Sequence, residues 1–498
     1  MNTALGKIDT ALGTIDTALD QRFTTVDGST GEGHSSLIFE QHYLDCLSQA
    51  SYLIGDPTSG KAVVVDPKRD IADYLASAGQ HGLEIVMVIE THFHADFLSG
   101  HLELADATGA EIAYGSAAEA EFEHRKLEDG ERVAIGEVVL EIRHTPGHTP
   151  ESISIVIWEH PGDADDPAAV PFGVLTGDTL FIGDVGRPDL LASIGVTADE
   201  LGRSLYTSLR EQLLTLPDET KLFPGHGAGS ACGKSLSTET VSTIGEQRSS
   251  NYALADMEVE DFLAVVTEGQ PAAPGYFVHD AILNRKERDL LSEGDAPESL
   301  DLDSVLSARD RGALVIDTRD QGAFSGGHVA GSVNIALDGR FAEYAGSVAR
   351  PGDDLVLVGE PGTELEARTR LARIGFDSVI GYLAHPYEAM ESNPDEVRQS
   401  SRLTAEEFLD RRTELDDLVV IDVRNPGEVE SGTLEDAVTV PVARLRDEIE
   451  ELAGHKNSPI VAMCAGGYRS SIAASLLRAN GFTDVSDLLG GYGALNAR

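Results

Sequence analysis

The sequence predicts an α/β protein made of several domains. From residue 37 onward, short runs rich in Val, Ile and Leu alternate with helix-forming stretches, the pattern of sheets covered by helices. Hydrophobic residues make up 41% of the 498 residues, enough to form buried cores, and a chain of this length exceeds one ordinary domain. Two stretches of the carboxyl-terminal half, 312–337 and 418–442, resemble each other, which indicates a duplicated unit. We therefore expect one α/β domain followed by two similar α/β domains.

Residues 1–36 form a separate extension. Seven-residue repeats (TALGKID, TALGTID, TALDQRF) give the alternating spacing of a coiled-coil seam, with apolar residues at Leu5, Ile8, Leu12, Ile15 and Leu19. A helix that associates through this seam would make the protein a homo-oligomer. Gly6 and Gly13 each cost about 1 kcal/mol in a helix relative to alanine, so a frayed leader is the open alternative. Residues 24–36, rich in Gly, Ser and Thr, are expected to be a linker.

The first globular domain is expected over residues 37–286. Apolar runs predict its strands at 61–66, 84–90, 137–144, 152–158 and 172–178. A charged segment that begins at Glu287 connects this domain to the duplicated part of the chain.

The duplicated unit predicts two further domains, over residues 298–392 and 402–498. In each copy an apolar strand ends in Asp-Thr-Arg or Asp-Val-Arg, and a second strand and a helix follow, at 355–376 and at 459–482. A polar stretch that contains Asn393 separates the two copies.

The charge balance excludes several classes of partner. Lys and Arg number 37 against 85 Asp and Glu, which leaves a formal charge of −48. A nucleic acid needs a basic face and an anionic membrane repels such a chain, so neither is expected as a partner. Because the negative charge is spread along the whole sequence, it favours adaptation to a salt-rich cytoplasm over an acidic binding surface. The sequence shows no signal peptide or membrane-spanning run, and its three scattered cysteines do not form a disulfide framework, so a cytoplasmic location is expected.

Residues that can bind a metal follow several of the predicted strands. The strand at 84–90 leads into THFHADFLSGH, which places His92, His94 and Asp96 just past its carboxyl end. Three more such residues follow other apolar strands: His148, Asp178 and His226. Because strand ends of an α/β domain gather at one edge, these side chains are expected to converge.

At these residues the sequence resembles the metallo-β-lactamase superfamily, whose signature is HxHxD followed by distant His, Asp and His residues. The resemblance covers about residues 37–286 and implies an αββα sandwich. Binuclear hydrolases of this superfamily, including glyoxalase II, carry a histidine directly after the motif aspartate, whereas this chain has Phe97. Because phenylalanine cannot bind a metal, the second metal site is incomplete and a mononuclear site is expected.

Two imidazoles and one carboxylate, from His92, His148 and Asp178, form the facial triad that suits non-haem Fe(II). Zinc prefers a tetrahedral cage with more nitrogen or sulfur ligands and is the metal expected for a hydrolase. The site resembles that of the persulfide dioxygenases, which implies one Fe(II) per chain, O₂ and a low-molecular-weight thiol persulfide as substrates, and sulfite and thiol as products. Three neighbours are then expected to orient the ligands through hydrogen bonds: His94, Asp96 and His226.

Two further segments lie close to this motif set in the sequence. GDVGRPD (183–189) resembles the segment that follows the metal aspartate in this family, and Arg187 is expected to bind a substrate carboxylate or, alternatively, to form a structural salt bridge. GAGSACGKS (227–235) resembles the segment of forms fused to rhodanese domains, and its Cys232 lies either near the substrate entrance or buried as a small apolar residue. Cys46 is expected to pack in the core.

A second chemically informative segment, CAGGYRS, begins at Cys464 between a predicted strand and helix. Backbone N–H groups and the positive end of the helix stabilise a thiolate there, and Arg469 adds a positive charge. The segment resembles the active-site loop of rhodanese sulfurtransferases, and IDVRNPGEVE (421–430) resembles their other signature. The resemblance implies that Cys464 and Arg469 are catalytic, with a persulfide loop made of Ala465, Gly466, Gly467 and Tyr468.

The first of the two copies lacks this cysteine. Gly359 or Glu360 stands at the corresponding place, and a carboxylate cannot carry sulfur. We expect this copy to keep the doubly wound rhodanese-like fold without transfer activity and to pack between the other two domains.

The order of the three domains resembles a fused persulfide dioxygenase–sulfurtransferase. Sulfite formed at the iron is an acceptor for a rhodanese persulfide, so we expect thiosulfate to be formed, or to be used in the reverse direction. Two alternatives stay open: a glyoxalase II-like thioester hydrolase with a binuclear metal site, and a non-catalytic scaffold in which the rhodanese-like copies bind partners.

Overall fold

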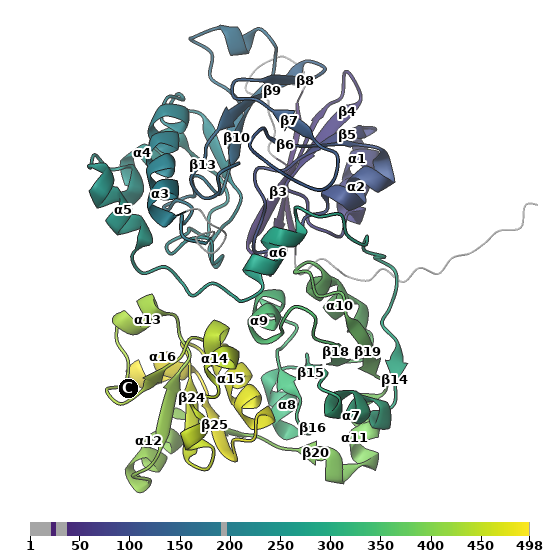
Figure 1. Cartoon of the computed structure of the whole chain (residues 1–498), viewed down its shortest axis with the longest axis vertical. Coiled ribbons are helices and arrows are strands. Elements are labelled where there is room, and N and C mark those ends of the chain that lie inside the picture. Colours follow the sequence, from purple (N-terminus) through teal and green to yellow (C-terminus); the bar gives the residue numbers. More distant parts are fainter. Residues whose placement is uncertain (1–20, 26–36, 191–196, 498) are drawn as a thin grey trace, which may run out of the picture.

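The computed structural model describes residues 21–25, 37–190 and 197–497. The apolar repeat positions that predict a coiled-coil seam lie outside these residues. We refer to residues 37–286 together with the strand at 21–25 as the N-terminal domain, to residues 298–392 as the middle copy and to residues 402–497 as the C-terminal copy. The two copies lie side by side below the N-terminal domain in Figure 1.

The N-terminal domain contains two sheets packed face to face. The first sheet has seven strands in sequence order: β1 (Gln21–Thr25), β2 (Ile38–Leu44), β3 (Gln49–Asp56), β4 (Lys61–Val65), β5 (Glu84–Ile89), β6 (Glu111–Gly115) and β7 (Arg125–Leu127). The second has six, ordered β13 (Ser242–Thr243), β12 (Lys221–Pro224), β11 (Gly173–Gly177), β10 (Ile153–Trp158), β9 (Val138–His144) and β8 (Arg132–Ile135). The two sheets share one apolar core, in which Phe39, Tyr52, Ile155 and Phe223 are each at most 1% exposed.

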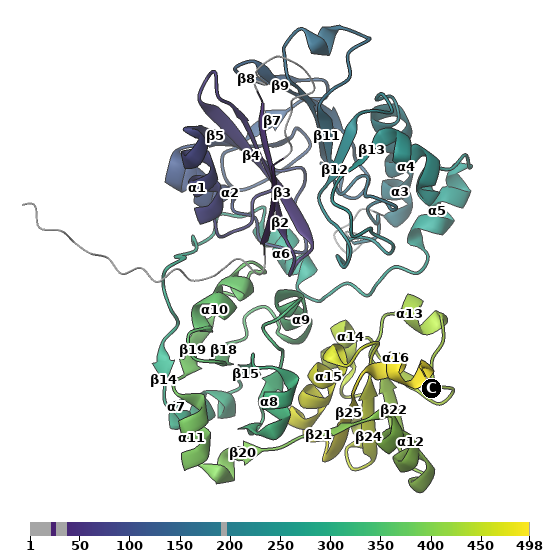
Figure 2. The same cartoon turned by 180° about the vertical axis from the view of Figure 1, so that it is seen from behind.

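Helices cover the outer face of each sheet (Figures 1 and 2). The first sheet is covered by α1 (Ala72–His81) and α2 (His101–Thr108). The second is covered by α3 (Ala198–Thr207), α4 (Ile244–Ser250) and α5 (Val259–Thr267), and α3 continues into a π-helical turn, Ser208–Leu213. The expected αββα sandwich is therefore confirmed. A further helix, α6 (Phe277–Leu283), lies on the side that faces the two copies.

The local sequence explains how these elements begin and end. Strand β10 reads ISIVIW, and all six side chains are buried, as expected for a β-branched run inside a sandwich. Helix α3 begins with a capping box, in which the Thr197 hydroxyl accepts from the backbone N–H of Glu200 and the Glu200 carboxylate accepts from Thr197. Helix α1 ends at Gly82, whose φ of 66° is the left-handed conformation that favours glycine.

The middle and C-terminal copies share one topology. In each, five parallel strands are ordered first, fifth, fourth, second, third along the sheet. The middle copy has β14 (Ser299–Leu300), β19 (Val379–Leu383), β18 (Leu355–Val358), β15 (Leu314–Asp317) and β17 (Val333–Asn334). The C-terminal copy has β21 (Ser401–Leu403), β25 (Asp484–Leu488), β24 (Pro459–Met463), β22 (Val419–Asp422) and β23 (Val438–Thr439). This match agrees with the internal duplication predicted from the sequence.

Helices surround the sheet of each copy (Figure 2). The middle copy has α7 (Leu302–Asp310), α8 (Gln321–Gly326), α9 (Phe341–Val348), α10 (Glu364–Ala372) and α11 (Pro386–Ser392). The C-terminal copy has α12 (Ala405–Glu414), α13 (Pro426–Glu430), α14 (Val442–Glu448), α15 (Tyr468–Ala479) and α16 (Gly491–Asn496). A short antiparallel ribbon of β16 (His328–Val329) and β20 (Val397–Arg398) joins the middle copy to the segment that leads into the C-terminal copy.

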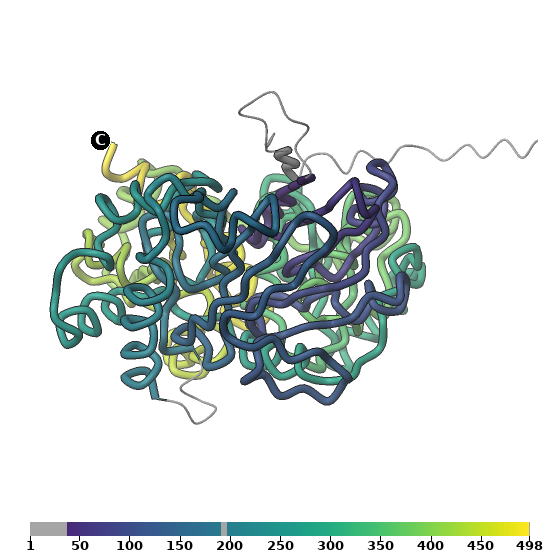
Figure 3. Tube along the Cα trace, turned by 90° about the horizontal axis from the view of Figure 1, so that it is seen from above, coloured from purple at the N-terminus to yellow at the C-terminus, as the bar shows by residue number. Residues whose placement is uncertain are grey.

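The two copies contact each other through α9 against α14 and through β17 against α15. The backbone N–H of Asn334 donates to the Ser475 hydroxyl at 3.0 Å, and the Ser471 hydroxyl donates to the Asn334 side chain at 2.9 Å. Figure 3 shows the half of the N-terminal domain that contains β2–β5 lying over the middle copy, and the half that contains α3–α5 lying over the C-terminal copy. The middle copy therefore contacts both of its neighbours, as expected.

Buried ion pairs connect the N-terminal domain to the middle copy. The Arg373 guanidinium donates to both oxygens of Asp70, at 2.7 and 2.8 Å, and the Lys68 ammonium donates to the same carboxylate at 2.7 Å. Burial alone would raise the pKa of Asp70, but the attraction of Arg373 and Lys68 holds it well below its usual value. Arg69, which directly precedes Asp70, donates to Asp377 of the middle copy at 3.0 Å. The carboxylate of Asp70 is therefore charged and fully paired inside the domain interface.

One part of the predicted N-terminal extension has a different structure. Thr24 and Thr25, which we expected in a linker, belong to β1, and β1 pairs with β2 in antiparallel register. The Thr-rich composition that suggested a linker is equally compatible with a strand, because threonine is β-branched. None of the helices in the described part of the chain is long and apolar enough to cross a bilayer.

The Asp70–Arg373 pair yields a stability prediction. Arg373→Leu leaves a buried carboxylate with Lys68 alone, and removing one partner of a buried pair costs about 3–5 kcal/mol. We expect the free energy of unfolding of the N-terminal domain to fall by about 3 kcal/mol, measured as a lower urea midpoint of the fluorescence of Trp158, the only tryptophan of the chain. Arg350→Gln, which removes an exposed pair with Asp447, is the control and should cost less than about 1 kcal/mol. Equal shifts of the urea midpoint in Arg373→Leu and Arg350→Gln would contradict a special contribution of the buried Asp70–Arg373 pair to stability.

Candidate functional site

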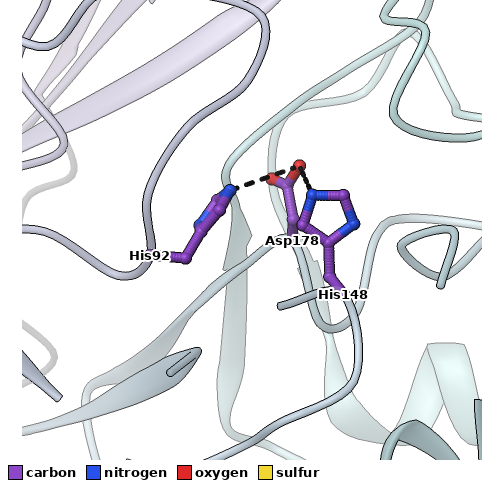
Figure 4. Close-up of side chains that lie close together, drawn as sticks. All are labelled: His92, His148 and Asp178. Atoms are coloured by element: carbon purple, nitrogen blue, oxygen red, sulfur yellow. Dashed lines mark ion pairs between the residues drawn. The ribbon is translucent and has the colours of Figure 1, made fainter. Parts of the chain in front are cut away.

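Three of the predicted metal-binding residues converge at one edge of the N-terminal sandwich (Figure 4). His92 follows β5, His148 follows β9, and Asp178 follows β11 directly. Asp178 Oδ2 lies 3.9 Å from His92 Nε2 and 3.5 Å from His148 Nε2, and all three residues are at most 2% exposed. The sequence spacing that predicted a common site therefore corresponds to a real convergence of side chains.

Hydrogen bonds fix the tautomers of the two imidazoles. His148 Nδ1 donates to the carbonyl of Arg187 at 2.9 Å, which leaves the lone pair on Nε2. Thr91 donates its hydroxyl to Asp66, so its oxygen accepts from His92 Nδ1 at 3.0 Å, and the His92 lone pair also lies on Nε2. Burial, followed by the charge of His94, lowers the pKa of His92 well below its usual value, so this ring is neutral. Both rings thus present the nitrogen lone pair that a metal ligand needs.

The buried polar atoms of this trio fit a cation. Among the described residues, His92 Nε2 and Asp178 Oδ2 are buried and have no hydrogen-bond partner. Such orphaned groups cost free energy unless something satisfies them. A metal ion held by His92, His148 and Asp178 would satisfy both atoms, because two imidazoles and one carboxylate form a donor set for a divalent transition metal.

The second oxygen of Asp178 is held by His226. His226 Nδ1 lies 2.8 Å from Asp178 Oδ1, and its Nε2 lies 2.7 Å from Asp96 Oδ2. Burial alone would raise the pKa of Asp178, but the attraction of His226 and of the other histidines holds it well below its usual value. Burial opposes the protonation of His226, yet the two carboxylates raise its pKa well above its usual value. Asp96 and His226 therefore lie directly behind Asp178, where they were expected to orient it.

His94 lies beside His92, with ring centroids 4.1 Å apart, but its Nε2 faces two carboxylates. Its Nε2 lies 3.1 Å from Asp66 Oδ1 and 3.3 Å from Glu90 Oε2, both fully buried. Although burial opposes protonation, these two carboxylates raise the pKa of His94 to about 10. His94 thus belongs to a group of its own with Asp66 and Glu90, separate from the trio of His92, His148 and Asp178. Phe97, at the position where binuclear members carry a histidine, is also buried, with its ring centroid 4.3 Å from that of His94.

The sequence analysis did not identify Asp66 and Glu90. Each directly follows a predicted apolar strand, at the end of KAVVVD and of EIVMVIE, which is the same signal that identified Asp178. Strands β4 and β5 are parallel neighbours, so their carboxyl ends bring these two carboxylates together.

Cys232 is buried and lies close to the ligand cluster. Its Sγ forms a second potential metal-binding group with Asp96 and His226, in which all ligand atoms lie within 4.8 Å of one another. Burial, together with the charges of Asp96 and Asp178, raises the pKa of the Cys232 thiol well above its usual value. Of the two positions considered for Cys232, the buried one is observed. Cys46 is fully buried in the core, as expected.

Arg187 is engaged by protein groups. Its Nε and Nη2 donate to the two oxygens of Asp189, both at 2.7 Å, and its Nη1 donates to the carbonyls of Ala231 and Pro271. These bonds correspond to the structural salt bridge that was the alternative for this residue, while binding of a substrate carboxylate by Arg187 stays a prediction. The backbone carbonyl of Arg187 instead orients His148.

Gly225 permits the close approach that holds the site together. A Cβ at this position would lie 2.6 Å from Asp178 Oδ1, so any side chain would displace the carboxylate. The glycine of the LFPGHG segment is thus required for the contact between Asp178 and His226.

A second site surrounds Cys464, which directly follows β24. The backbone N–H of Gly467 lies 3.0 Å from Cys464 Sγ, and the Sγ lies 3.6 Å from the Ser470 hydroxyl. Gly467 has a φ of 104°, which lets the loop curl back toward the sulfur at the start of α15. The loop of Ala465, Gly466, Gly467 and Tyr468 therefore curls around the sulfur, and its role in holding a persulfide stays a prediction.

Arg469, expected to stabilise the Cys464 thiolate, is held by a carboxylate. Its two terminal nitrogens donate to the two oxygens of Glu428, at 2.6 and 2.7 Å. In the middle copy Gly359 follows β18 as Cys464 follows β24, so Gly359 is the residue at the cysteine position. Glu360, the next residue, accepts a hydrogen bond from the Tyr387 hydroxyl.

Comparisons with known proteins agree with this arrangement. The model of the metallo-beta-lactamase superfamily matches residues 44–226, and the rhodanese-like domain model matches residues 301–392 and 404–498. The chain is 30% identical over 241 residues to the mitochondrial persulfide dioxygenase ETHE1 of Bos taurus, covering 48% of this chain and 83% of that protein. It is 33% identical over 182 residues to a hydroxyacylglutathione hydrolase of Polaromonas sp., covering 35% of this chain and 61% of that protein.

A solved structure extends the similarity beyond one domain. A metallo-beta-lactamase from Staphylococcus aureus subsp. aureus COL is 32% identical with a TM-score of 0.63, and the match covers 70% of this chain and 100% of that one.

The geometry predicts different effects for two aspartates. Asp178→Asn removes the carboxylate that faces both imidazoles, and we expect metal affinity to fall at least about tenfold. Asp96→Asn keeps the trio intact, so the variant should still hold about one metal ion per chain. Metal content measured after anaerobic loading with Fe(II), and separately with Zn(II), tests this difference. Loss of one of two bound ions in Asp96→Asn would instead establish a binuclear site.

Proposed function

Because the chain belongs to the metallo-β-lactamase superfamily, with persulfide dioxygenases among its homologues, and carries two rhodanese-like domains, we propose that it oxidises thiol persulfides and transfers sulfur. The substrate of the N-terminal domain is a low-molecular-weight thiol persulfide. One persulfide, one O₂ and one water give one sulfite and one thiol, so the terminal sulfur is oxidised and O₂ is reduced. In the C-terminal copy, the Cys464 thiolate takes the outer sulfur of a second thiol persulfide, whose sulfur–sulfur bond breaks to release the thiol, and carries that sulfur as a persulfide.

One Fe(II) held by His92, His148 and Asp178 would supply the open-shell centre that O₂ needs to react with a closed-shell sulfur anion. The surrounding groups orient the two imidazoles and keep the carboxylate ionised. Thr91 and the Arg187 carbonyl hold the two imidazoles with their lone pairs toward Asp178, and His226 keeps Asp178 ionised. Near-complete burial of the trio keeps bulk water away from the ligands.

The observation that carries the proposal is the loss of donors on the other side of the trio. A binuclear hydrolase needs ligands for a second metal ion, and here Phe97 stands at one ligand position while the Nε2 of His94 faces the carboxylates of Asp66 and Glu90. Three protein donors on one face leave coordination positions for two exogenous ligands, as a dioxygenase requires.

Sulfur transfer follows from the chemistry of Cys464. Backbone N–H groups of the loop and the start of α15 favour a sulfur anion there. Sulfite attacks the outer sulfur of the Cys464 persulfide, the sulfur–sulfur bond to the cysteine breaks, and its electron pair remains on Cys464 as thiolate. The product is thiosulfate, and the reverse reaction loads Cys464 from thiosulfate.

Oxygen uptake tests the two halves of this function. The iron-loaded protein should consume O₂ when given glutathione persulfide and release sulfite and thiosulfate. Cys464→Ser should retain O₂ uptake within about twofold of the unaltered protein, because Cys464 lies in a different domain, but should form no thiosulfate. Absence of O₂ uptake in a sample with one iron per chain would refute the oxidation, and thiosulfate formation by Cys464→Ser would refute the role of Cys464.

A thioester hydrolase with two metal ions is the second candidate. The group of Asp96, His226 and Cys232 favours it, because these side chains offer donors next to Asp178, and the chain is similar to a hydroxyacylglutathione hydrolase. A metal-bound hydroxide would then attack the thioester. A non-catalytic scaffold is the third candidate, which the cysteine-less middle copy suggests for that domain alone.

Metal stoichiometry separates these candidates. About one iron per chain, with no hydrolysis of S-lactoylglutathione, is the result expected for the dioxygenase. Two zinc ions per chain together with thioester hydrolysis would support the hydrolase, and a protein that binds no metal after loading would support the scaffold.

A further inference from the structure

Cys464 opens into a cavity that both rhodanese-like copies enclose. The cavity has a volume of about 510 Å³. The C-terminal copy contributes Cys464, Gly466, Tyr468 and Arg469. The middle copy contributes Asp320, Gln321, Ala336, Asp338, Gly339, Arg340 and Tyr344. The copy that has no cysteine of its own therefore forms much of the wall around the cysteine of the other copy.

A second cavity, of about 600 Å³, lies where all three domains meet. Its walls include the 229–236 loop of the N-terminal domain, which flanks Cys232, and helix α9 of the middle copy. Arg340, Tyr344 and Arg469 line both cavities, so the two spaces adjoin at these side chains. A small molecule in the space between the N-terminal domain and Cys464 therefore meets Arg340.

Arg340 has donors that the protein does not use. It caps α9 and forms an ion pair with Glu343 through Nη2, while its Nε is buried without a hydrogen-bond partner among the described residues. The guanidinium carbon and Nη1 lie 3.5 Å from the place that a Cβ on Gly229 would occupy, so the group rests against the backbone of the N-terminal domain. Arg469, by contrast, already has both terminal nitrogens on Glu428.

The surroundings of Arg340 favour an anionic ligand. Burial lowers the pKa of its guanidinium, and the nearby charge of Arg469 acts in the same direction, so a bound anion would relieve an existing electrostatic cost. The acidic residues of the Cys464 cavity, Asp320 and Asp338, are exposed to solvent, where their charges are screened. On the inner side, Glu343 pairs with Nη2 of Arg340 and Glu428 pairs with both terminal nitrogens of Arg469, so the donor left for an anion is the buried Nε of Arg340.

We propose that Arg340 of the cysteine-less copy binds the sulfur oxyanion that exchanges sulfur with Cys464. The ligand is sulfite in one direction and thiosulfate in the other. A guanidinium offers several N–H donors in a fixed plane, which suits the oxygens of a small oxyanion. This inference rests on the proposed function, because it assumes that Cys464 carries the sulfane sulfur. Arg340 positions the acceptor, and Cys464 remains the residue that exchanges sulfur.

The test compares a charged acceptor with an uncharged one. The full-length protein is loaded at Cys464 with thiosulfate, and transfer is then measured to sulfite, to dithiothreitol and to glutathione. In Arg340→Gln the KM for sulfite should rise about tenfold or more, and the ratio of transfer efficiency for sulfite to that for dithiothreitol should fall by the same factor. Arg340→Lys keeps the charge and the aliphatic stem but loses the planar fork, so its KM for sulfite should lie between the two.

Arg311→Gln is the matched control. Arg311 is an exposed arginine of the same copy, at the end of α7 and outside both cavities, so its KM for sulfite should be unchanged. An unchanged KM for sulfite in Arg340→Gln, or an equal loss with dithiothreitol, would overturn this inference alone. If Arg340→Gln lowered the transfer efficiency to glutathione more than that to sulfite, the inference would be overturned, and Arg340 would instead bind the carboxylates of the thiol. No transfer to any acceptor by the unaltered protein would overturn both the proposed function and this inference.

Discussion

The buried carboxylate of Asp178 constrains the whole N-terminal site. A carboxylate at 2% exposure is stable as an anion only if positive groups or donors surround it. His226 satisfies one oxygen, and the other faces two imidazole nitrogens that carry lone pairs instead of protons. A cation completes this arrangement. Four strand ends, those of β5, β9, β11 and β12, must meet within a few ångströms for it to form, and Gly225 supplies the space for that approach.

The middle copy has a rhodanese-like fold and contacts both of the other domains. Gly359 stands at the position that corresponds to Cys464, and the copy forms specific polar contacts with both neighbours. On one side, Arg373 pairs with the buried Asp70 of the N-terminal domain. On the other, Asn334 bonds to Ser471 and Ser475 of the C-terminal copy. Loss of the cysteine leaves these contacts intact, and they determine the relative placement of the metal site and Cys464.

Elements and site residues that are marked by a short local sequence pattern could be predicted from the sequence. The apolar runs at β4, β5, β9, β10 and β11 predicted strands, and the polar residues that follow several of them predicted His92, His148 and Asp178 as one cluster. What depends on tertiary pairing could not be predicted. Asp66 and Glu90 both contact His94 because β4 and β5 are parallel neighbours in the sheet. The ion pair between Arg187 and Asp189 depends on how the 183–189 segment folds. Arg340 has no local signal, since its position depends on the packing of three domains.

Because the chain has a large negative net charge, the binding of an anion near Cys464 depends on the charges close to that residue and not on the electrostatic field of the whole protein. A sulfite dianion that approaches a protein of formal charge −48 is repelled at long range. At an ionic strength of about 0.15 M this repulsion is screened beyond roughly 8 Å, and it is screened more strongly in concentrated salt. Binding then depends on groups within a few ångströms that solvent ions do not reach. Arg340 lies where three domains meet, and although its Nη2 pairs with Glu343, its Nε is buried and has no hydrogen-bond partner among the described residues.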